Sequence, residues 1–171
     1  MKKLFSLIQI SVYNFLMSTF EIVLFNPEIP PNTGNIMRLC ANTGCNLHII
    51  EPIGFKINEK TLRRAGMDYI KNIKTEIYKN IDSFLKKNNF KRFFLVSKFG
   101  KIIFSEVNYQ HGDCFIFGSE SQGLPKDIIN KFKNSNIIKI PMTNNSRSLN
   151  ISNAVAVIVY EGLRQNNFQF R

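Results

Sequence analysis

The feature that most constrains the fold is a polar loop held between two apolar segments near the C-terminus. The first segment, residues 137–140, has the length of a short buried strand, and Pro141 ends it. The loop reads MTNNSRSLN and is dense in hydroxyl and amide side chains. The second segment, 154–160, predicts a buried helix by its length, with Asn150 or Ser152 as N-cap, although its β-branched residues favour a strand. A polar loop in this position indicates a binding site or a costly irregularity.

The length and charge of the chain narrow the classes of protein and partner. With 171 residues, 44% of them hydrophobic, the chain can form one domain with its own core. Its formal net charge of +11 suggests an anionic partner, either a nucleic acid or a membrane surface, and the alternative is a merely Lys-rich exterior. The three cysteines match no metal-ligand spacing, and we interpret them as reduced thiols of a cytoplasmic protein.

Residues 1–18 differ in character from the rest of the chain. Two lysines precede an apolar stretch, as in a signal peptide, but no small-residue cleavage site follows and the stretch is too short to span a bilayer. The other interpretations are an extra helix, a disordered extension, or an upstream start codon with translation beginning at Met17. We therefore predict an N-terminal extension, no membrane span, and a single domain over residues 19–171.

Strands and helices alternate through that domain. Apolar runs predict strands at 21–25, 47–52, 74–78, 91–97, 113–118 and 137–140. Three prolines are expected to exclude regular structure up to Pro31. Helices are predicted from a cap at Asn32 or Thr33 to Gly44, over 81–90 with Asp82 or Ser83 as cap, near Pro125, and from the polar loop onward to about Gln165. This alternation is typical of an α/β fold with a mostly parallel sheet.

Three polar loops each follow a predicted strand. Their sequences are NPEIPPNTGN, GSESQGLP and PMTNNSRSLN. Ligands of open α/β sheets bind beyond the carboxyl ends of the strands, so the loops could converge on one site. None is a dinucleotide fingerprint or a Walker A loop, and no H-x-E or CxxC pairing predicts a metal. We interpret His48, on an apolar strand, and His111, in a turn, as structural.

A basic segment follows the second predicted strand. It is predicted to form a polar helix that carries Arg63 and Arg64. The two arginines are interpreted either as contacts to RNA phosphates or as part of a solvated face.

The loops lie in longer motifs: N-P-E-I-P-P-N-T-G-N-I-x-R-L-C-A-N-T-G, F-G-x-E-x-x-G-L-P and I-P-M-x-x-x-S-R-S-L-N-x-S-N-A-V-A-V. Over about residues 20–166, the chain resembles the SPOUT-class RNA 2′-O-ribose methyltransferases. I-E-P-x-G-F, within 49–55, and L-R-R-A-G-x-D-Y, at 62–69, make it most similar to the small bacterial tRNA enzymes of the TrmL (YibK-like) group, which methylate the wobble nucleotide.

The resemblance implies a fold, a reaction and partners. The fold would be an α/β sheet with a C-terminal deep trefoil knot, and the enzyme a cytoplasmic homodimer acting on the tRNA anticodon stem-loop. The reaction would transfer a methyl group from S-adenosylmethionine, without a metal, to the ribose 2′-hydroxyl of cytidine 34 or uridine 34. The alternatives are a sister enzyme acting on rRNA or another tRNA position, and a non-catalytic RNA-binding module.

The resemblance also implies roles for individual residues. Arg38 would lie near the reacting hydroxyl, where we interpret it as an electrostatic partner rather than a base because a guanidinium does not give up its proton in proteins. Residues that would position nucleotide and cofactor are Asn32, Glu120, Ser148 and Asn150. Cofactor contacts would come from Val96, Gly118, Ile140, Ser148 and Leu149. The second motif departs from the group's pattern at Ser119, Ser121 and Gln122, which stand where proline, threonine and arginine are usual. The missing arginine puts one RNA or dimer contact in doubt, but not the cofactor site.

Overall fold

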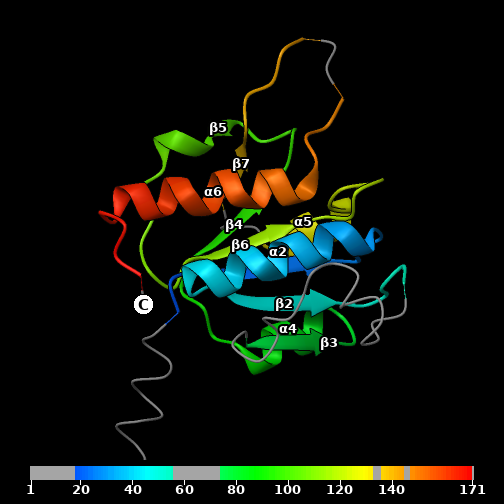
Figure 1. Cartoon of the computed structure of the whole chain (residues 1–171). Coiled ribbons are helices and arrows are strands. Elements are labelled where there is room, and N and C mark those ends of the chain that lie inside the picture. Colours follow the sequence, from blue (N-terminus) through cyan, green and yellow to red (C-terminus); the bar gives the residue numbers. More distant parts are fainter. Residues whose placement is uncertain (1–17, 56–73, 133–135, 145–146, 171) are drawn as a thin grey trace, which may run out of the picture.

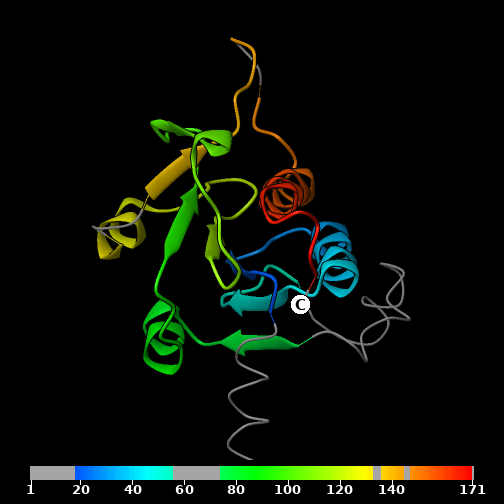
Figure 2. The same cartoon turned by 90° about the vertical axis from the view of Figure 1, so that its left-hand side faces the viewer.

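A parallel sheet between two layers of helices organises the domain (Figures 1 and 2). The computed structural model describes residues 18–55, 74–132, 136–144 and 147–170. In chain order, these residues form β1 (Glu21–Phe25), α2 (Pro30–Thr43), β2 (Asn46–Ile50), β3 (Thr75–Tyr78), α4 (Ile81–Lys87), β4 (Phe93–Val96), β5 (Ile102–Ile103), the 3₁₀ helix η2 (Phe104–Glu106), β6 (Cys114–Phe117), α5 (Lys126–Lys131), β7 (Asn136–Lys139) and α6 (Ile151–Gln165). The extension 1–17 and the predicted basic helix lie outside the described residues.

The strand order is β3-β2-β1-β6-β4-β7-β5, and every pair of neighbouring strands is parallel. Figure 2 shows α2 and α6 on one face of the sheet and α4 and α5 on the other. The predicted α/β fold with a mostly parallel sheet is confirmed.

Burial on both faces explains why the strands read as continuous apolar runs. Along β1, Ile22 and Leu24 join the core beneath α2 and α6, while Val23 and Phe25 join the core on the side of α4 and α5. Successive side chains of a strand point to opposite faces, so a central strand covered on both sides needs apolar residues at every position. The same coverage gives α6 its buried face of Val155, Ile158, Val159 and Leu163, in spite of its β-branched residues.

The predicted start of the first helix is wrong. Helix α2 begins at Pro30, with Ile29 as the N-cap residue, and not after Pro31. Proline is compatible with the first turn of a helix because the N–H that it lacks would have no partner inside the helix there. The predicted end at Gly44 is confirmed, since this residue adopts a left-handed conformation with φ of 69°.

Other boundaries also differ from the predictions. The N-cap of α4 is Asn80, and Ser83 completes a capping box with it, while Asp82 only adds an acidic side chain to the first turn. The short elements β5 and η2 have no counterpart among the predictions. The N-cap of α6 is Asn150, one of the two expected residues, and its side chain accepts the N–H of Ser152.

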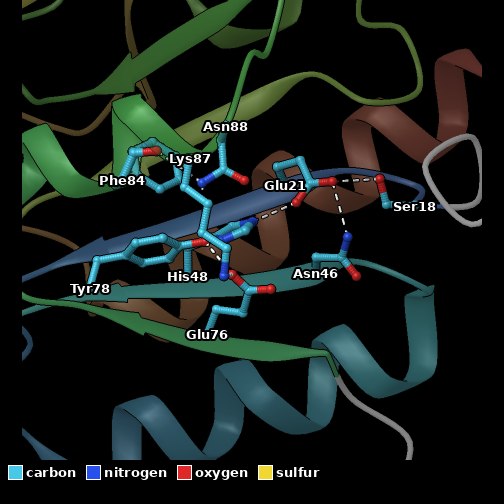
Figure 3. A network of polar contacts seen from close by, with 9 residues as sticks. All are labelled: Ser18, Glu21, Asn46, His48, Glu76, Tyr78, Phe84, Lys87 and Asn88. Carbon is cyan, nitrogen blue, oxygen red and sulfur yellow. Dashed lines mark hydrogen bonds and ion pairs between the residues drawn. The ribbon is translucent and has the colours of Figure 1, made fainter. Parts of the chain in front are cut away.

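A buried polar network links β1, β2 and β3 (Figure 3). His48 Nε2 lies 2.6 Å from Glu21 Oε2, and His48 Nδ1 lies 3.2 Å from the hydroxyl of Tyr78. That hydroxyl donates to Glu76, which also accepts Lys87 Nζ at 2.8 Å. His48 and Glu21 are 3% and 5% exposed, so partners inside the protein satisfy both ring nitrogens. This arrangement agrees with the structural interpretation of His48.

A second buried carboxyl group, that of Asp113, precedes β6. Its Oδ1 lies 3.1 Å from Arg92 Nε, and its Oδ2 accepts the backbone N–H of Gln110 at 2.8 Å. Burial raises the pKa of Asp113 to about 6, against the opposing effects of these two partners. Folding therefore favours the protonated carboxyl. The protonated Asp113 carboxyl therefore contributes to the free energy of unfolding. This contribution is fully present below the ordinary carboxyl pKa and is lost as pH rises through about 6.

Replacement of Asp113 by asparagine isolates this effect. Between about pH 4.5 and pH 7, the free energy of unfolding of the wild type should fall relative to that of Asp113→Asn, by on the order of 1 kcal/mol. Urea unfolding at both pH values measures the difference, and the exposed carboxyl of Asp82, changed to asparagine, serves as the control. A difference that does not change with pH would contradict the raised pKa.

Candidate active site

A cavity of about 260 Å³ lies at the carboxyl edge of the central strands. It is lined by the segments 96–99, 117–124 and 148–151 and by Asn32, Ile140, Met142 and Ala154. Its size is close to the lower end of the roughly 300–1,000 Å³ typical of small-molecule sites. Apolar side chains and polar loop residues both contribute to the lining, as such sites require.

The strand order brings the three polar loops to this cavity. Strand β6 lies between β1 and β4, and β7 lies on the other side of β4. Because all four strands are parallel, the segments that follow them leave the sheet at the same edge. The predicted convergence of the loops is therefore confirmed for the described residues.

The loop after β6 forms a tight turn against the cavity. The backbones of Ser119 and Gly123 exchange two hydrogen bonds, of 3.2 and 2.9 Å. A Cβ on Gly118 would lie 2.0 Å from the carbonyl carbon of Gly123 and 2.2 Å from the nitrogen of Leu124. Gly123 has φ of +71°, a conformation that suits glycine. The turn thus depends on one glycine for space and on another for backbone conformation.

Three of the predicted positioning residues form one hydrogen-bonded network. Glu120 Oε1 accepts Asn32 Nδ2 at 2.9 Å, and Asn32 Oδ1 accepts Asn150 Nδ2 at 2.9 Å. Glu120 also accepts the backbone N–H groups of Glu28, at 2.8 Å, and Ile29, at 3.2 Å. A carboxylate at the N-terminus of α2 is favoured by the helix dipole and by the unpaired N–H groups there. The network joins the turn after β6 to the first turns of α2 and α6.

The remaining predicted residues fall into three groups. All five predicted cofactor residues line the cavity: Val96, Gly118, Ile140, Ser148 and Leu149. Arg38 is exposed on α2, about 9 Å along the helix axis from Asn32, and is not part of the lining. Arg63 and Arg64 lie outside the described residues.

The mouth of the cavity carries three exposed apolar residues, of which the sequence reasoning missed two, Phe99 and Met142. Phe99 is 81% exposed, and Met142 and Leu149 are 39% and 40% exposed. Figure 1 shows the segment after β7 projecting beyond the sheet before the chain returns to α6. Phe99 lies three residues after the end of β4, in a segment that lines the cavity, and this position after a strand was the available signal.

The three cysteines are free thiols inside the core. Burial raises the pKa of Cys45 to about 12, and it also raises the pKa of Cys40 and of Cys114. Protonated buried thiols are poor nucleophiles and poor metal ligands. Among the described residues, no group of three or more His, Cys, Asp or Glu side chains could hold a metal ion.

Within the same part of the chain, no helix combines the length and apolarity needed to cross a membrane.

The chain matches known proteins over most of its length. Residues 19–160 match the model of the SpoU rRNA Methylase family. A tRNA (cytidine(34)-2'-O)-methyltransferase of Saccharophagus degradans is 50% identical over 149 residues, covering 87% of this chain and 97% of that protein. One of Escherichia coli K12 is 51% identical over 145 residues, covering 85% and 92%. A solved structure that concerns the 2-OH methylation of C/U34 on tRNA superposes with a TM-score of 0.81 and 36% identity, covering 88% and 97%.

Proposed function

This chain belongs to the SpoU rRNA methylase family, and we propose that it is a tRNA 2′-O-methyltransferase that modifies the ribose of wobble cytidine or uridine 34. The observation that carries the proposal is the Glu120–Asn32–Asn150 network beside the cavity, which unites the three motifs at one site. The names of its relatives, at about half identity over nearly their whole length, supply the substrate and the position.

The methyl donor is S-adenosylmethionine, and the residues present fit it. The walls of the cavity include Val96, Ile140 and Leu149, which suit an adenine ring, and Gly118, where the backbone is not covered by a side chain. Ser148 adds a hydroxyl group to the same wall. When bound, this cofactor supplies a methyl group on a positively charged sulfur.

The side chains of the protein then have two tasks. They must align the ribose 2′-hydroxyl with the methyl carbon and stabilise the alkoxide that develops as the hydroxyl loses its proton. We assign the second task to Arg38, which stays protonated and acts as an electrostatic partner of the alkoxide or of an adjacent RNA phosphate that accepts the proton. Glu120, whose carboxylate already accepts three N–H donors, holds Asn32 in place.

The RNA partner is the anticodon stem-loop of tRNA. The net charge of +11 supports a polyanionic ligand, because each neutralised phosphate releases counterions. Arg63 and Arg64 are proposed phosphate contacts. The cytoplasm is the proposed location, since tRNA is modified there and the buried thiols are free.

We also propose that the C-terminal segment forms a deep trefoil knot within a single domain of residues 19–171. Support comes from β7, which lies between the earlier strands β4 and β5. The turn that connects these two strands packs tightly on β7, because a Cβ on Gly100 would lie 2.6 Å from the carbonyl carbon of Ile138. From β7 the chain continues to α6, on the face shared with α2 (Figure 2).

A homodimer is the proposed assembly. Helices α2 and α6 lie side by side on one face (Figures 1 and 2), and Tyr160 on α6 is 49% exposed. Two further exposed aromatic residues follow this helix, Phe168 and Phe170, at 52% and 55%. Light scattering coupled to size-exclusion chromatography tests the assembly, and a monomer at micromolar concentration would refute it.

A methylation assay tests the function directly. The purified protein is incubated with labelled S-adenosylmethionine and with RNA from a strain that lacks the gene. We expect the label at nucleotide 34 of tRNA, located by mass mapping of nuclease fragments. Label in rRNA or at another tRNA position would reassign the enzyme within its family. RNA binding without label, and without calorimetric binding of S-adenosylmethionine, would reduce the protein to an RNA-binding module.

A further inference from the structure

Two loops beside the cavity, the loop before α2 and the turn after β6, each supply a carboxylate that accepts hydrogen bonds from the other loop. We propose that Glu28 and Ser121 form a clasp that positions the reacting groups for methyl transfer. The proposal rests on the proposed function and adds Glu28 and Ser121 to its machinery as positioning residues. The Glu28–Ser121 clasp joins the loop before α2 to the turn after β6.

Both oxygens of the Glu28 carboxylate take part in the clasp. Glu28 Oε1 accepts the hydroxyl of Ser121 at 2.7 Å, and Glu28 Oε2 accepts the N–H of Ser121 at 3.1 Å. In the reverse direction, Glu120 accepts the N–H groups of Glu28 and Ile29. Hydrogen bonds to ionised acceptors are stronger than neutral ones, so the two contacts reinforce each other across a chain separation of about ninety residues.

The backbone of Glu28 is held from its other side. The N–H of Gly54 donates to the carbonyl of Pro27 at 2.9 Å, and a Cβ on Gly54 would lie 2.9 Å from the Cα of Glu28. The loop before α2 therefore has a defined place on which the clasp can act. Two residues after Glu28 the helix begins, and it carries Asn32 in its first turn and Arg38 further along.

The clasp has a task separate from folding the turn after β6. The paired backbones of Ser119 and Gly123 hold that turn without it, so Gly118 and the adjoining cavity wall keep their positions when the clasp is lost. Together with the contacts of Glu120, the clasp instead sets the distance between that wall and α2. Its loss should therefore impair the alignment of the hydroxyl more than the binding of the cofactor.

Four variants test the clasp: Ser121→Ala, Ser121→Thr, Glu28→Ala and the double alanine variant. For Ser121→Ala and Glu28→Ala, we expect kcat to fall by about three- to tenfold, the loss of one or two partly exposed charge-assisted hydrogen bonds. In Glu28→Ala, whose replaced side chain does not line the cavity, the Kd for S-adenosylmethionine, measured by calorimetry, should stay within about twofold of the wild type. Ser121→Thr keeps the hydroxyl and should keep the kcat of the wild type. The double variant should be no slower than Glu28→Ala, because removal of the Glu28 carboxylate already breaks both hydrogen bonds to Ser121.

Hydrogen exchange supplies a readout that does not need activity. The amide of Ser121 should exchange faster in Glu28→Ala, and in Ser121→Thr it should be protected as in the wild type. Equal protection in all variants would overturn the clasp even if the protein methylated no RNA, whereas the absence of labelling by the wild type would overturn only the proposed function. If the wild type is active, three results would overturn the clasp. The first is an unchanged kcat in the single alanine variants, and the second is a loss in the double variant equal to the product of the two single losses. The third is a loss of activity that follows a lowered Tm and is not rescued in Ser121→Thr.

Discussion

Replacement of Arg38 by alanine should lower kcat by about 10²–10³-fold, the usual cost of removing one stabilising donor from a developing oxyanion. In the proposed role, the guanidinium would offer a permanent positive charge where the 2′-oxygen loses its proton, and alanine would offer none. The Kd for S-adenosylmethionine should stay within about twofold, because Arg38 does not line the cavity. Single-turnover kinetics with saturating tRNA separates the chemical step from binding.

Two further measurements make this result interpretable. Because Arg38 is exposed, the free energy of unfolding should change by only about 0.5 kcal/mol. Arg38→Lys keeps the charge but loses the planar fork, and it should retain activity between those of the wild type and the alanine variant. Equal losses of turnover and of cofactor binding in Arg38→Ala would refute the role assigned to this residue.

Replacement of Gly118 by alanine should raise the Kd for S-adenosylmethionine by roughly 100-fold or more, equivalent to about 3 kcal/mol. The new Cβ would lie 2.0 Å from the carbonyl carbon of Gly123, and no change of rotamer can relieve an overlap with backbone. The turn must therefore open, and the cavity wall that it forms must move. Calorimetry on the folded variant measures the loss.

Gly123→Ala is the matched control in the same turn. A Cβ on Gly123 would meet no heavy atom within 4 Å, but the residue has φ of +71°. The expected cost is about 1–2 kcal/mol of backbone strain, seen mainly in the free energy of unfolding. If Gly118→Ala bound the cofactor as tightly as Gly123→Ala does, the close approach at Gly118 would have no part in the site.

Local patterns predicted most of the elements, and the errors have local causes too. The run in α6 was identified as a helix because its length outweighed the preference of its β-branched residues, and burial against the sheet supplies the stability that propensity does not. The start of α2 was misplaced because the effect of proline inside a helix was applied to the first turn. The cap of α4 was misplaced because Asn80, Asp82 and Ser83 are all suitable caps, and the structure identifies Asn80 by its capping box with Ser83.

The candidate site was predictable in outline. Parallel strands release their following loops at one edge, so polar loops after apolar strands indicated a shared site before any contact was known. The contacts themselves were not predictable from this rule. Glu28 stood within the first motif without a role, and its partner Ser121 stood in the second as a departure from the usual threonine.

The sequence by itself determined the alternation of strands and helices, the position of the polar loop between 137–140 and 154–160, and the family. These properties depend on side-chain periodicity, turn chemistry and motif spacing, which are local. Only the tertiary structure decided which loops touch, because the contacts of Glu120 with Asn32 and of Ser121 with Glu28 require β6 to lie between β1 and β4. The order of the strands along the chain does not predict that β6 lies between β1 and β4 in the sheet. The polar loop that follows β7 faces a cavity because the strand order places it there.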